Sequence, residues 1–280
     1  MKMYKDILLQ EAKVLKRLEG RWHIVGLLAD HDKVEQLYRE NQPGNSSDTH
    51  NTIFEEGDDP FFLLMEYIPN GTLLEFQTKT WKKDPPIPNR ILWQIFLCLL
   101  EATFEMAELG EDFCHKDQHL QNVMFGDVDS YLHRLVPIVK YIDFGNATGH
   151  EWKPGPPYQQ RTDLWGHRPT GIQVNIYDVG GLMEQLFRQQ SFIAGHWYQI
   201  GHYPNLDGDL LDLVVRCRSR DPARRPTIED CLKQIDTAIV DKTRPEHFPN
   251  RSHSANETDD FIRTYVHDHI FHPNADPSNP

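Results

Sequence analysis

The stretch CHKDQHLQNVMFGDVDSYLHRLVPIVKYIDFG, which runs from Cys114 to Gly145, decides the fold of this chain. It carries a group of polar residues at each end. The first group is His115-Lys116-Asp117 followed by Asn122, and the second is Asp143-Phe144-Gly145. An apolar run lies next to each group. This arrangement predicts two short strands, each with a polar motif beside it.

The two apolar runs are Val123-Met124-Phe125, after the first motif, and Val139 to Ile142, before the second. We expect a turn around Gly126-Asp127 to pair them as a hairpin. The start of the first strand then lies beside the end of the second strand. Both polar motifs therefore come to the same end of the predicted hairpin.

Three side chains of these motifs carry carboxylate or amide oxygens: Asp117, Asn122 and Asp143. Carboxylates that lie close together repel each other unless a cation sits between them. Ligand sets made of oxygen alone select a hard ion such as Mg²⁺. The sequence therefore predicts a magnesium site, and magnesium in turn suggests a substrate that bears phosphate.

The spacing H-x-D-x-x-x-x-N followed by D-F-G resembles the catalytic core of the eukaryotic protein kinase family. The resemblance implies that Asp117 orients the substrate hydroxyl and accepts its proton, and that Asn122 and Asp143 hold the metal ions that bridge the ATP phosphates. It implies the cofactors ATP and Mg²⁺ and a protein Ser or Thr hydroxyl as the substrate. The residues placed in the catalytic loop are His115, Lys116, Asp117 and His119, and Phe144 and Gly145 complete the D-F-G motif.

Two further segments resemble the C-terminal lobe of the same family. The segment SRDPARRPTIEDC, residues 219–231, is similar to the D-P-x-x-R-P-T signature, with Arg225 as its structural arginine. Asn175 to Leu182 is similar to helix F, where Asn175 replaces the aspartate that braces the catalytic loop. An amide still accepts a hydrogen bond, without the assistance of charge. The resemblance covers Lys5 to about Ala238.

The run from Phe61 to Ile68 predicts a buried strand that ends at the turn Pro69-Asn70-Gly71. It is similar to the family's fifth strand and hinge, which places Met65 at the gatekeeper position. The backbone from Glu66 to Ile68 would then hydrogen-bond an adenine. The residues that the resemblance implies for nucleotide binding are Met65, Glu66, Tyr67, Ile68 and Met124.

The front of the chain is similar to helix C and the strand after it. Tyr4 to Glu19 has apolar residues at helical spacing, and Gly20 is a natural stop. Glu11 matches the helix C glutamate, which in the family pairs with a lysine of the third strand, or it is a solvated helix residue. His23 to Leu28 reads as the strand that follows. Residues 31–59 are polar, and we expect a long loop there.

The expected fold class is α+β: a bilobal protein kinase-like fold with a reduced N-terminal lobe (helix C plus a few strands) and a mainly helical C-terminal lobe. The expected domains are a partial N-lobe at 1–67, a C-lobe at 68–240 and a polar C-terminal tail at 241–280. Helices are expected at Thr72–Phe76, Asn89–Leu109, Gly171–Gln189, Leu210–Arg218, after the cap Thr227, and at Asp259–Phe271. The tail is either solvated or a metal site formed by His267, His269 and His272.

The sequence departs from the family in its front part, where it has neither a G-x-G-x-x-G loop nor a V-A-I-K strand before the helix C segment. The expected N-terminus is therefore truncated or divergent, and a late start of the sequence would explain it. Losing both elements removes phosphate contacts and could cost several powers of ten in rate. This leaves open a catalytically weak pseudokinase that acts as a scaffold.

Smaller departures lie in the catalytic core. Lys116 replaces the usual Arg, His119 stands where many Ser/Thr kinases have Lys, and no A-P-E glutamate is present to pair with Arg225. The pattern D-x-H-x-x-N also occurs in small-molecule kinases of the aminoglycoside and choline type, which is a second alternative. The D-P-x-x-R-P-T segment favours the protein kinase lineage.

Composition limits the class of protein. The chain has 280 residues, a net charge of −13 and 39% hydrophobic residues, which is typical of a globular protein. An acidic chain is a poor binder of nucleic acid or of anionic membranes. The charged start does not resemble a signal peptide. Four widely spaced cysteines predict reduced thiols and an intracellular protein, cytoplasmic or nuclear, with its oligomeric state left open. They are Cys98, Cys114, Cys217 and Cys231.

Overall fold

The computed structural model describes residues 2–40, 61–81, 86–110, 112–129, 131–147, 171–188, 206–241 and 254–271. These residues form helices and two small antiparallel sheets. The elements in chain order are α1 (Lys2–Arg17), β1 (Leu27–Asp30), α2 (His31–Glu40), β2 (Leu63–Met65), α3 (Leu73–Thr80), α4 (Asn89–Ala107), β3 (Val123–Phe125), β4 (Val139–Tyr141), α5 (Gly171–Arg188), α6 (Gly208–Cys217), α7 (Ile228–Asp241) and α8 (Asp259–Val266).

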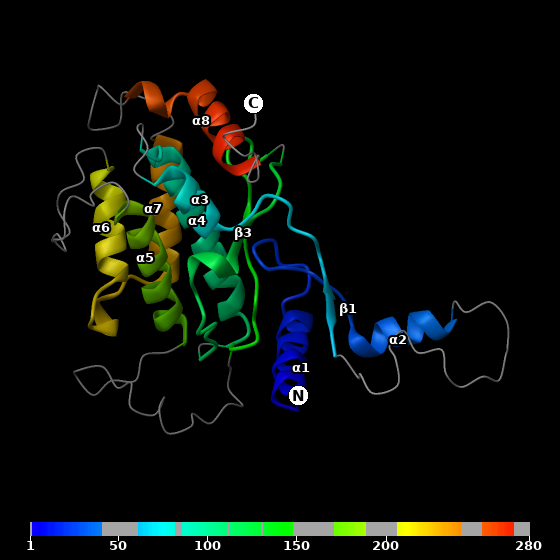
Figure 1. Cartoon of the computed structure of the whole chain (residues 1–280). Coiled ribbons are helices and arrows are strands. Elements are labelled where there is room, and N and C mark those ends of the chain that lie inside the picture. The colour runs from blue at the N-terminus through cyan, green and yellow to red at the C-terminus, as the bar shows by residue number, and fades with distance from the viewer. Residues whose placement is uncertain are drawn as a thin grey trace.

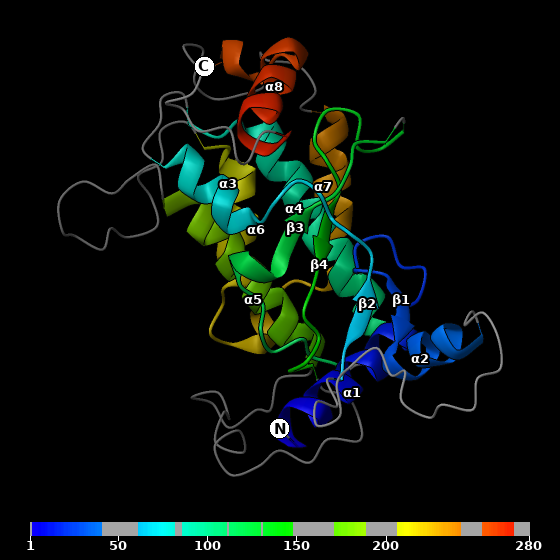
Figure 2. The same ribbon diagram turned by 45° about the vertical axis from the view of Figure 1, so that its right-hand side comes forward.

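The elements are arranged around the hairpin of β3 and β4. Helices α3 to α8 lie on one side of it, and α1, β1, α2 and β2 lie on the other (Figures 1 and 2). Most of the regular structure is helical. This mixture of helices with small sheets agrees with the expected α+β class.

The hairpin itself confirms the two strands expected from the sequence. Val123 lies opposite Tyr141 and Phe125 lies opposite Val139 in an antiparallel pair. The end of the first motif, Asn122, and the start of the second, Asp143, therefore lie at one end of the hairpin, because the chain enters β3 where it leaves β4.

The expected turn at Gly126-Asp127 is wrong. The ladder continues past β3, since the Gly126 N–H donates to the Ile138 carbonyl at 2.8 Å and the Ile138 N–H donates to the Asp127 carbonyl at 3.1 Å. The chain reverses farther on, where the Asp129 side chain accepts hydrogen bonds from the backbone N–H groups of Tyr131 (2.6 Å) and His133 (3.0 Å). An aspartate that bonds the backbone two residues ahead in this way forms a turn by itself.

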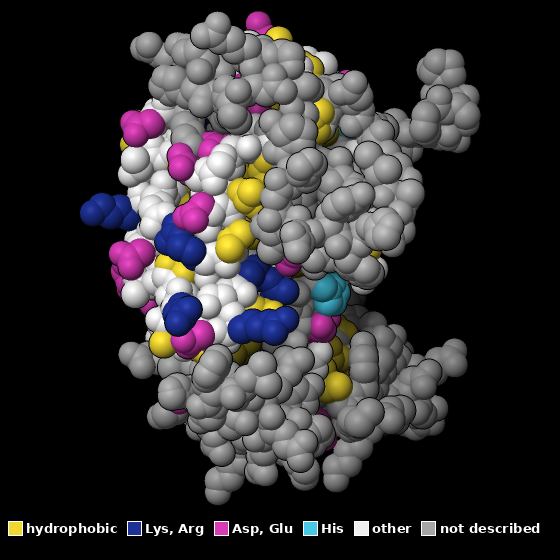
Figure 3. Space-filling model, turned by 90° about the vertical axis from the view of Figure 1, so that its left-hand side faces the viewer, with side chains coloured by type: hydrophobic (Ala, Val, Ile, Leu, Met, Phe, Trp, Pro, Cys, Tyr) yellow, Lys and Arg dark blue, Asp and Glu magenta, His cyan; other side chains and the backbone are white. Residues whose placement is uncertain are grey.

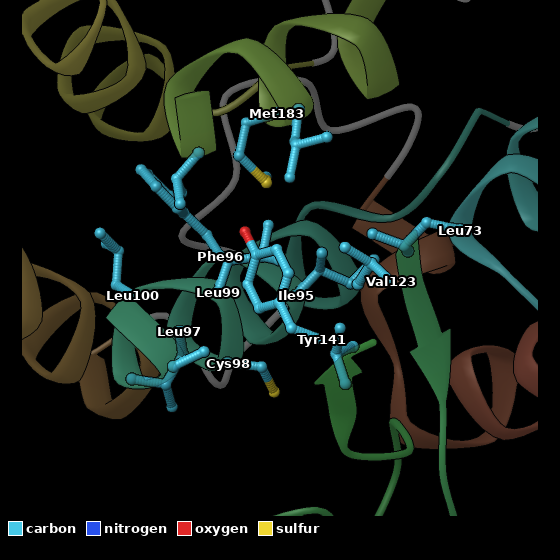
Figure 4. Close-up of a cluster of buried hydrophobic side chains, with 14 of the residues drawn as sticks. Leu73, Ile95, Phe96, Leu97, Cys98, Leu99, Leu100, Val123, Tyr141 and Met183 are labelled. Atoms are coloured by element: carbon cyan, nitrogen blue, oxygen red, sulfur yellow. The ribbon is translucent and has the colours of Figure 1, made fainter. Parts of the chain in front are cut away.

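Helix α4 forms the centre of the core. It packs against α5, α7 and β4, and its buried side chains cover more than one face, as the sequence predicts. Figure 4 shows the Tyr141 ring among the side chains of α4, with Val123 and Met183 beside it. Among the described residues, no helix combines the length and the apolar composition that a membrane crossing requires.

The front elements differ in detail from the expected strands. Helix α1 is followed by Gly20 in the left-handed region (φ 76°), which confirms the predicted stop. Strands β1 and β2 pair with each other but are shorter than predicted. The segment from His23 to Val25 instead joins the central hairpin: the Val25 N–H donates to the Tyr141 carbonyl at 3.0 Å, and the Tyr141 N–H donates to the His23 carbonyl at 2.8 Å.

The expected loop at 31–59 is wrong in its first part, because residues 31–40 form helix α2. The Asp30 side chain accepts a hydrogen bond from the Lys33 N–H at 3.0 Å and so satisfies one of the open donors of the first turn. A polar composition therefore did not exclude a helix here. Residues 41–59 lie outside the described residues.

The expected polar tail at 241–280 is also wrong where the structure describes it. Helix α8 continues into a π-helical turn at His267–Phe271, close to the predicted helix bounds. Its apolar side is buried, and the Tyr265 ring packs edge-on against Phe76 of α3 with ring centroids 6.4 Å apart. The four buried residues of this segment are Ile262, Tyr265, Val266 and Ile270.

Glu257, which precedes α8, caps the N-terminus of α4. Its carboxylate accepts hydrogen bonds from the backbone N–H groups of Asn89 (2.7 Å) and Arg90 (3.1 Å). The residue before the helix is Pro88, whose side chain forms no cap bond. Glu257 therefore supplies both the acceptor and the negative charge that a helix N-terminus favours.

Candidate active site

The segment of the first motif, residues 115–122, is fixed by a buried histidine. The His115 Nε2 atom lies 3.3 Å from the Ile142 carbonyl, and its Nδ1 atom accepts the Asp117 N–H at 3.3 Å. The ring also packs on Phe144, with centroids 4.6 Å apart. Burial lowers the pKa of His115 to about 4. The neutral imidazole therefore joins the catalytic loop to the D-F-G segment.

The three predicted oxygen ligands come from the end of the hairpin where the motifs meet. The Asn122 Nδ2 atom donates to the Asp117 carbonyl at 3.0 Å. The Ile142 N–H, which directly precedes Asp143, donates to the Asn122 carbonyl at 3.0 Å. A chain of backbone and amide contacts thus connects Asp117, Asn122 and the segment of Asp143.

The Asp117 carboxylate has two polar neighbours. Its Oδ2 atom accepts a hydrogen bond from the Asn146 Nδ2 atom at 3.1 Å, and its Oδ1 atom lies 3.4 Å from the His119 Nε2 atom. Asn146, which follows D-F-G directly, was not among the residues predicted from the sequence. His119 lies beside the candidate base, Asp117.

The backbone is strained at both motifs. Lys116 (φ 66°) and Asp143 (φ 59°) are the non-glycine residues with positive φ within the described ranges. Such conformations cost of the order of 1–3 kcal/mol each and cluster at functional sites. Gly145, the next glycine after Asp143, allows the close approach of α1, because an added Cβ would lie 2.7 Å from the Ile7 side chain.

The donor set fits a hard divalent cation. Because the Asn122 Nδ2 atom donates to Asp117, its Oδ1 atom remains for a metal. The Asp143 Oδ1 atom accepts the Gly145 N–H at 3.2 Å, which orients the carboxylate and leaves its second oxygen. Oxygen ligands of this kind suit Mg²⁺.

Glu11 of α1 faces the D-F-G segment. Its Oε1 atom accepts the Phe144 N–H at 3.0 Å, and the side chain is buried. Burial raises the pKa of the Glu11 carboxyl, the Phe144 hydrogen bond opposes this, and the charge of Asp143 adds to it. Glu11 forms no ion pair with any residue that the structure describes, whereas Lys140 of β4 pairs with Glu66.

Asn175 of α5 holds the segment of the first motif in place through three hydrogen bonds. Its Oδ1 atom accepts hydrogen bonds from the His115 N–H (3.1 Å) and the Gln118 Nε2 atom (2.9 Å). Its Nδ2 atom donates to the Phe113 carbonyl at 3.1 Å. A carboxylate could supply the first two contacts but not the third. The amide is therefore matched to its surroundings.

The predicted hinge residues lie on β2 and just after it. Met65 is half-buried in β2, and the Glu66 N–H donates to the Gly26 carbonyl at 2.9 Å. Tyr67 is exposed and Ile68 is buried. Within the described chain, no backbone hydrogen bond engages Tyr67 or Ile68. Met124 of β3 is half-buried and packs against the core.

Arg225 anchors α5 to the segment before α7. Its Nη1 atom donates to the Gln173 carbonyl at 2.7 Å and its Nε atom donates to the Ser219 carbonyl at 2.9 Å. The guanidinium also lies over the Tyr177 ring, 4.7 Å from the centroid. Backbone carbonyls and an aromatic face thus supply contacts for Arg225 in a chain without an A-P-E glutamate.

The histidines near the C-terminus are engaged separately. His267 lies 3.1 Å from the Asp268 carboxylate, and His269 stacks on Tyr265 with centroids 4.2 Å apart. His272 lies outside the described residues. A different group of histidines, His23 and His133 with Glu101, lies close together. The sequence did not reveal it because the three residues belong to three distant segments.

Charge on the surface is mixed. On the face shown in Figure 3, the described Lys and Arg side chains lie among Asp and Glu side chains rather than in a continuous track. Two cavities, of about 430 and 500 Å³, lie away from both motifs: one among α4, α7 and α8, the other against α1 and β1.

Parts of curated serine/threonine-protein kinases are similar to this chain. No family model matches the chain. It is 25% identical to the serine/threonine-protein kinase ULK3 of Mus musculus in an alignment 196 residues long, which covers 63% of this chain and 39% of that protein. It is 24% identical to the probable serine/threonine-protein kinase roco5 of Dictyostelium discoideum over 209 residues, which cover 63% of this chain and 7% of that protein.

Both relatives are distant, and the chain spans less than half the length of either. They support a kinase-like relationship for this chain.

Proposed function

We propose that this chain is a kinase-like domain of two lobes that binds ATP with Mg²⁺ and transfers the γ-phosphate to a Ser or Thr hydroxyl of a protein. One observation carries the proposal. The buried His115 of the first motif contacts the Ile142 carbonyl and the Phe144 ring of the second. The two motifs are therefore one connected unit, as a site that joins a base to metal ligands requires.

In this proposal each residue has a distinct task. Asp117 orients the substrate hydroxyl and accepts its proton, and Asn146 and the Asn122 amide hold it in place. Asn122 and Asp143 would hold Mg²⁺, which, when bound, neutralises the charge of the phosphates. The backbone at 66–68 would hydrogen-bond the adenine, and Met65 and Met124 would contact the nucleotide.

Nucleotide binding is the first property to test. The experiment compares the thermal unfolding of the full chain with and without ATP and Mg²⁺. A ligand at a hundred times its Kd stabilises the native state by about 2.7 kcal/mol. Asp143→Asn should abolish the part of this stabilisation that depends on Mg²⁺. Asp127 is an exposed acid beyond β3, so Asp127→Asn is the matched control and should keep the Mg²⁺-dependent stabilisation.

An unchanged shift in Asp143→Asn would contradict the metal role, and no shift in the folded wild-type chain would contradict nucleotide binding. If binding is found, transfer of labelled γ-phosphate to a mixed Ser/Thr peptide substrate follows. Asp117→Asn should then reduce the rate by at least about 100-fold, the usual contribution of a general base.

A nucleotide-binding scaffold without phosphotransfer is the second candidate. The contact of Glu11 with the Phe144 backbone, together with the pairing of Lys140 with Glu66, favours it. In the family, the helix C glutamate positions a lysine on the phosphates. A scaffold would show the ATP-dependent thermal shift but no transfer, and Asp117→Asn would change nothing measurable.

A further inference from the structure

Three ionisable side chains from three separate segments meet beside the central hairpin. His23 lies between α1 and β1, Glu101 lies on α4, and His133 lies on the connection between β3 and β4. One ligand atom of each lies within 4.8 Å of the other two. The His23 Nε2 atom and the Glu101 Oε2 atom are 2.8 Å apart. Both histidines are buried, at 4% and 1% exposure.

A buried cysteine stands next to this group. Cys98 lies one turn before Glu101 on α4, and residues three apart share one face of a helix. The Cys98 Sγ atom is 3.9 Å from the His133 Nδ1 atom and 4.0 Å from its Nε2 atom. One thiol, one carboxylate and two imidazoles therefore surround a small volume. Figure 4 labels Cys98 on the side of α4 toward β4.

The orientation of His23 is set from outside the group. Its Nδ1 atom lies 3.0 Å from the Val139 carbonyl and so carries the proton that it donates. The Nε2 atom, on the other side of the ring, then faces the Glu101 carboxylate. Glu105 lies one turn farther on α4. Its carboxylate fixes the backbone at His23 by accepting hydrogen bonds from the N–H groups of Trp22 (3.0 Å) and His23 (3.3 Å). Histidine ligands of metals show this arrangement, with the second ring nitrogen donating to a backbone carbonyl.

The charges of the group suit a cation. The two imidazole rings are buried with centroids 5.9 Å apart, and two buried imidazolium ions at this separation repel each other. Without a metal, a single proton on the His23 Nε2 atom can occupy the 2.8 Å contact with Glu101. A divalent ion would take the place of that proton, because a carboxylate and a thiolate balance its charge and the imidazoles remain neutral.

We propose that His23, Cys98, Glu101 and His133 form a structural Zn²⁺ site. Zinc takes four ligands of this kind at about 2.0–2.3 Å, which places tetrahedral ligand atoms about 3.3–3.8 Å apart. The ligand atoms of His23, Glu101 and His133 lie within 4.8 Å of one another, and the Cys98 Sγ atom lies 3.9 Å from the His133 Nδ1 atom, so small side-chain movements would bring the four ligands to these distances. The ion would fasten the segment after α1, helix α4 and the hairpin connection to one another. This site is independent of the proposed phosphotransfer, because it shares no residue with either motif.

The test uses the full chain, stripped of metal and titrated with Zn²⁺ against a chromophoric chelator. We expect one Zn²⁺ per chain. Cys98→Ala and His133→Ala should each weaken affinity at least about 100-fold, since even the loss of an outer partner costs 10–100-fold. Cys217→Ala removes a buried cysteine outside the group and His267→Ala removes an exposed histidine. Both controls should bind Zn²⁺ as the wild type does.

A second measurement keeps the proposal testable if a core variant fails to fold. Co²⁺ bound to the wild-type chain should give thiolate-to-cobalt charge-transfer absorption, which Zn²⁺ removes. Glu101→Gln, at a side chain that is 32% exposed, should weaken Zn²⁺ binding without loss of the fold. No charge-transfer band, no Zn²⁺ bound by the wild type, or equal binding by Cys98→Ala and Cys217→Ala would overturn the proposal and leave the group as a His–Glu ion pair.

Discussion

The carboxylate of Glu11 and the backbone N–H of Phe144 are 3.0 Å apart and joined by a hydrogen bond. This contact ties α1 to the D-F-G segment. The donor is a buried backbone group, and the acceptor is 6% exposed. Helix α1 therefore takes part in fixing the backbone next to Asp143, in addition to the apolar packing of its buried face.

Removing this acceptor should destabilise the chain. In Glu11→Ala the Phe144 N–H stays buried without its partner, which costs about 1–3 kcal/mol. Glu11→Gln keeps an acceptor oxygen and should cost less. Gln10→Ala, at an exposed position of the same helix, is the control. Urea unfolding measures all three. Equal midpoints for Glu11→Ala and Gln10→Ala would show that the contact is not significant.

An aspartate at position 175, as is usual in the protein kinase family, should not stabilise this chain. The Asn175 Nδ2 atom donates to the Phe113 carbonyl at 3.1 Å, and a carboxylate would set an oxygen against that carbonyl. We expect Asn175→Asp to lower the free energy of unfolding by about 1–3 kcal/mol. Gln185→Glu, the same change of chemistry at an exposed site of α5, should stay within about 0.5 kcal/mol.

A more stable Asn175→Asp chain would contradict this reading of the amide. It would mean that the charge of the carboxylate toward the His115 and Gln118 donors outweighs the lost contact to Phe113.

The stability of the chain should fall in acid partly because of His115. Burial lowers the pKa of His115 to about 4, whereas an unfolded histidine titrates near 6.5. Between these values the unfolded state binds a proton that the folded state does not. Stability contributed by His115 is therefore complete above pH 6.5 and is lost as the pH falls toward 4, by up to about 3 kcal/mol.

The measurement is the free energy of unfolding at pH 7.5 and at pH 4.5. The difference between these two values should be smaller in His115→Phe than in the wild type. His267→Phe, at a side chain that is 62% exposed, should leave the difference unchanged. Carboxylates contribute equally to all three proteins, so the comparison isolates the histidine. The same pH dependence in wild type and His115→Phe would contradict the lowered pKa.

Local patterns predicted the hairpin and its two motifs because each strand borders its own polar group. The spacing from Val123 to Phe125 and from Val139 to Tyr141 is enough to define both strands. The position of the turn was not predictable in the same way. Gly126-Asp127 is a good turn sequence, but the side chain of Asp129 bonds the backbone ahead of it and places the reversal later.

Contacts between distant segments could not be read from the sequence. The polar composition of the C-terminal region suggested a solvated tail, yet Tyr265 packs on Phe76, which lies 189 residues earlier in the chain. The group of His23, Glu101 and His133 depends on three segments that only the fold brings together. The roles of Asp117, Asn122 and Asp143 stay predictions, although the structure places them at one end of the hairpin.

The carboxylate of Glu257 accepts hydrogen bonds from the N–H groups of Asn89 and Arg90 at the start of α4. Burial raises the pKa of this carboxyl, and the hydrogen bonds from Asn89 and Arg90 oppose the shift. Glu257→Ala should cost about 1–3 kcal/mol, because it removes a cap and leaves donors at the helix N-terminus unsatisfied. Asp260→Ala, at a side chain that is 97% exposed, should cost less than about 0.5 kcal/mol. If chemical unfolding finds the two variants equally stable, then the segment before α8 does not support the central helix; a large loss in Glu257→Ala alone would mean that the C-terminal region is part of the folded domain.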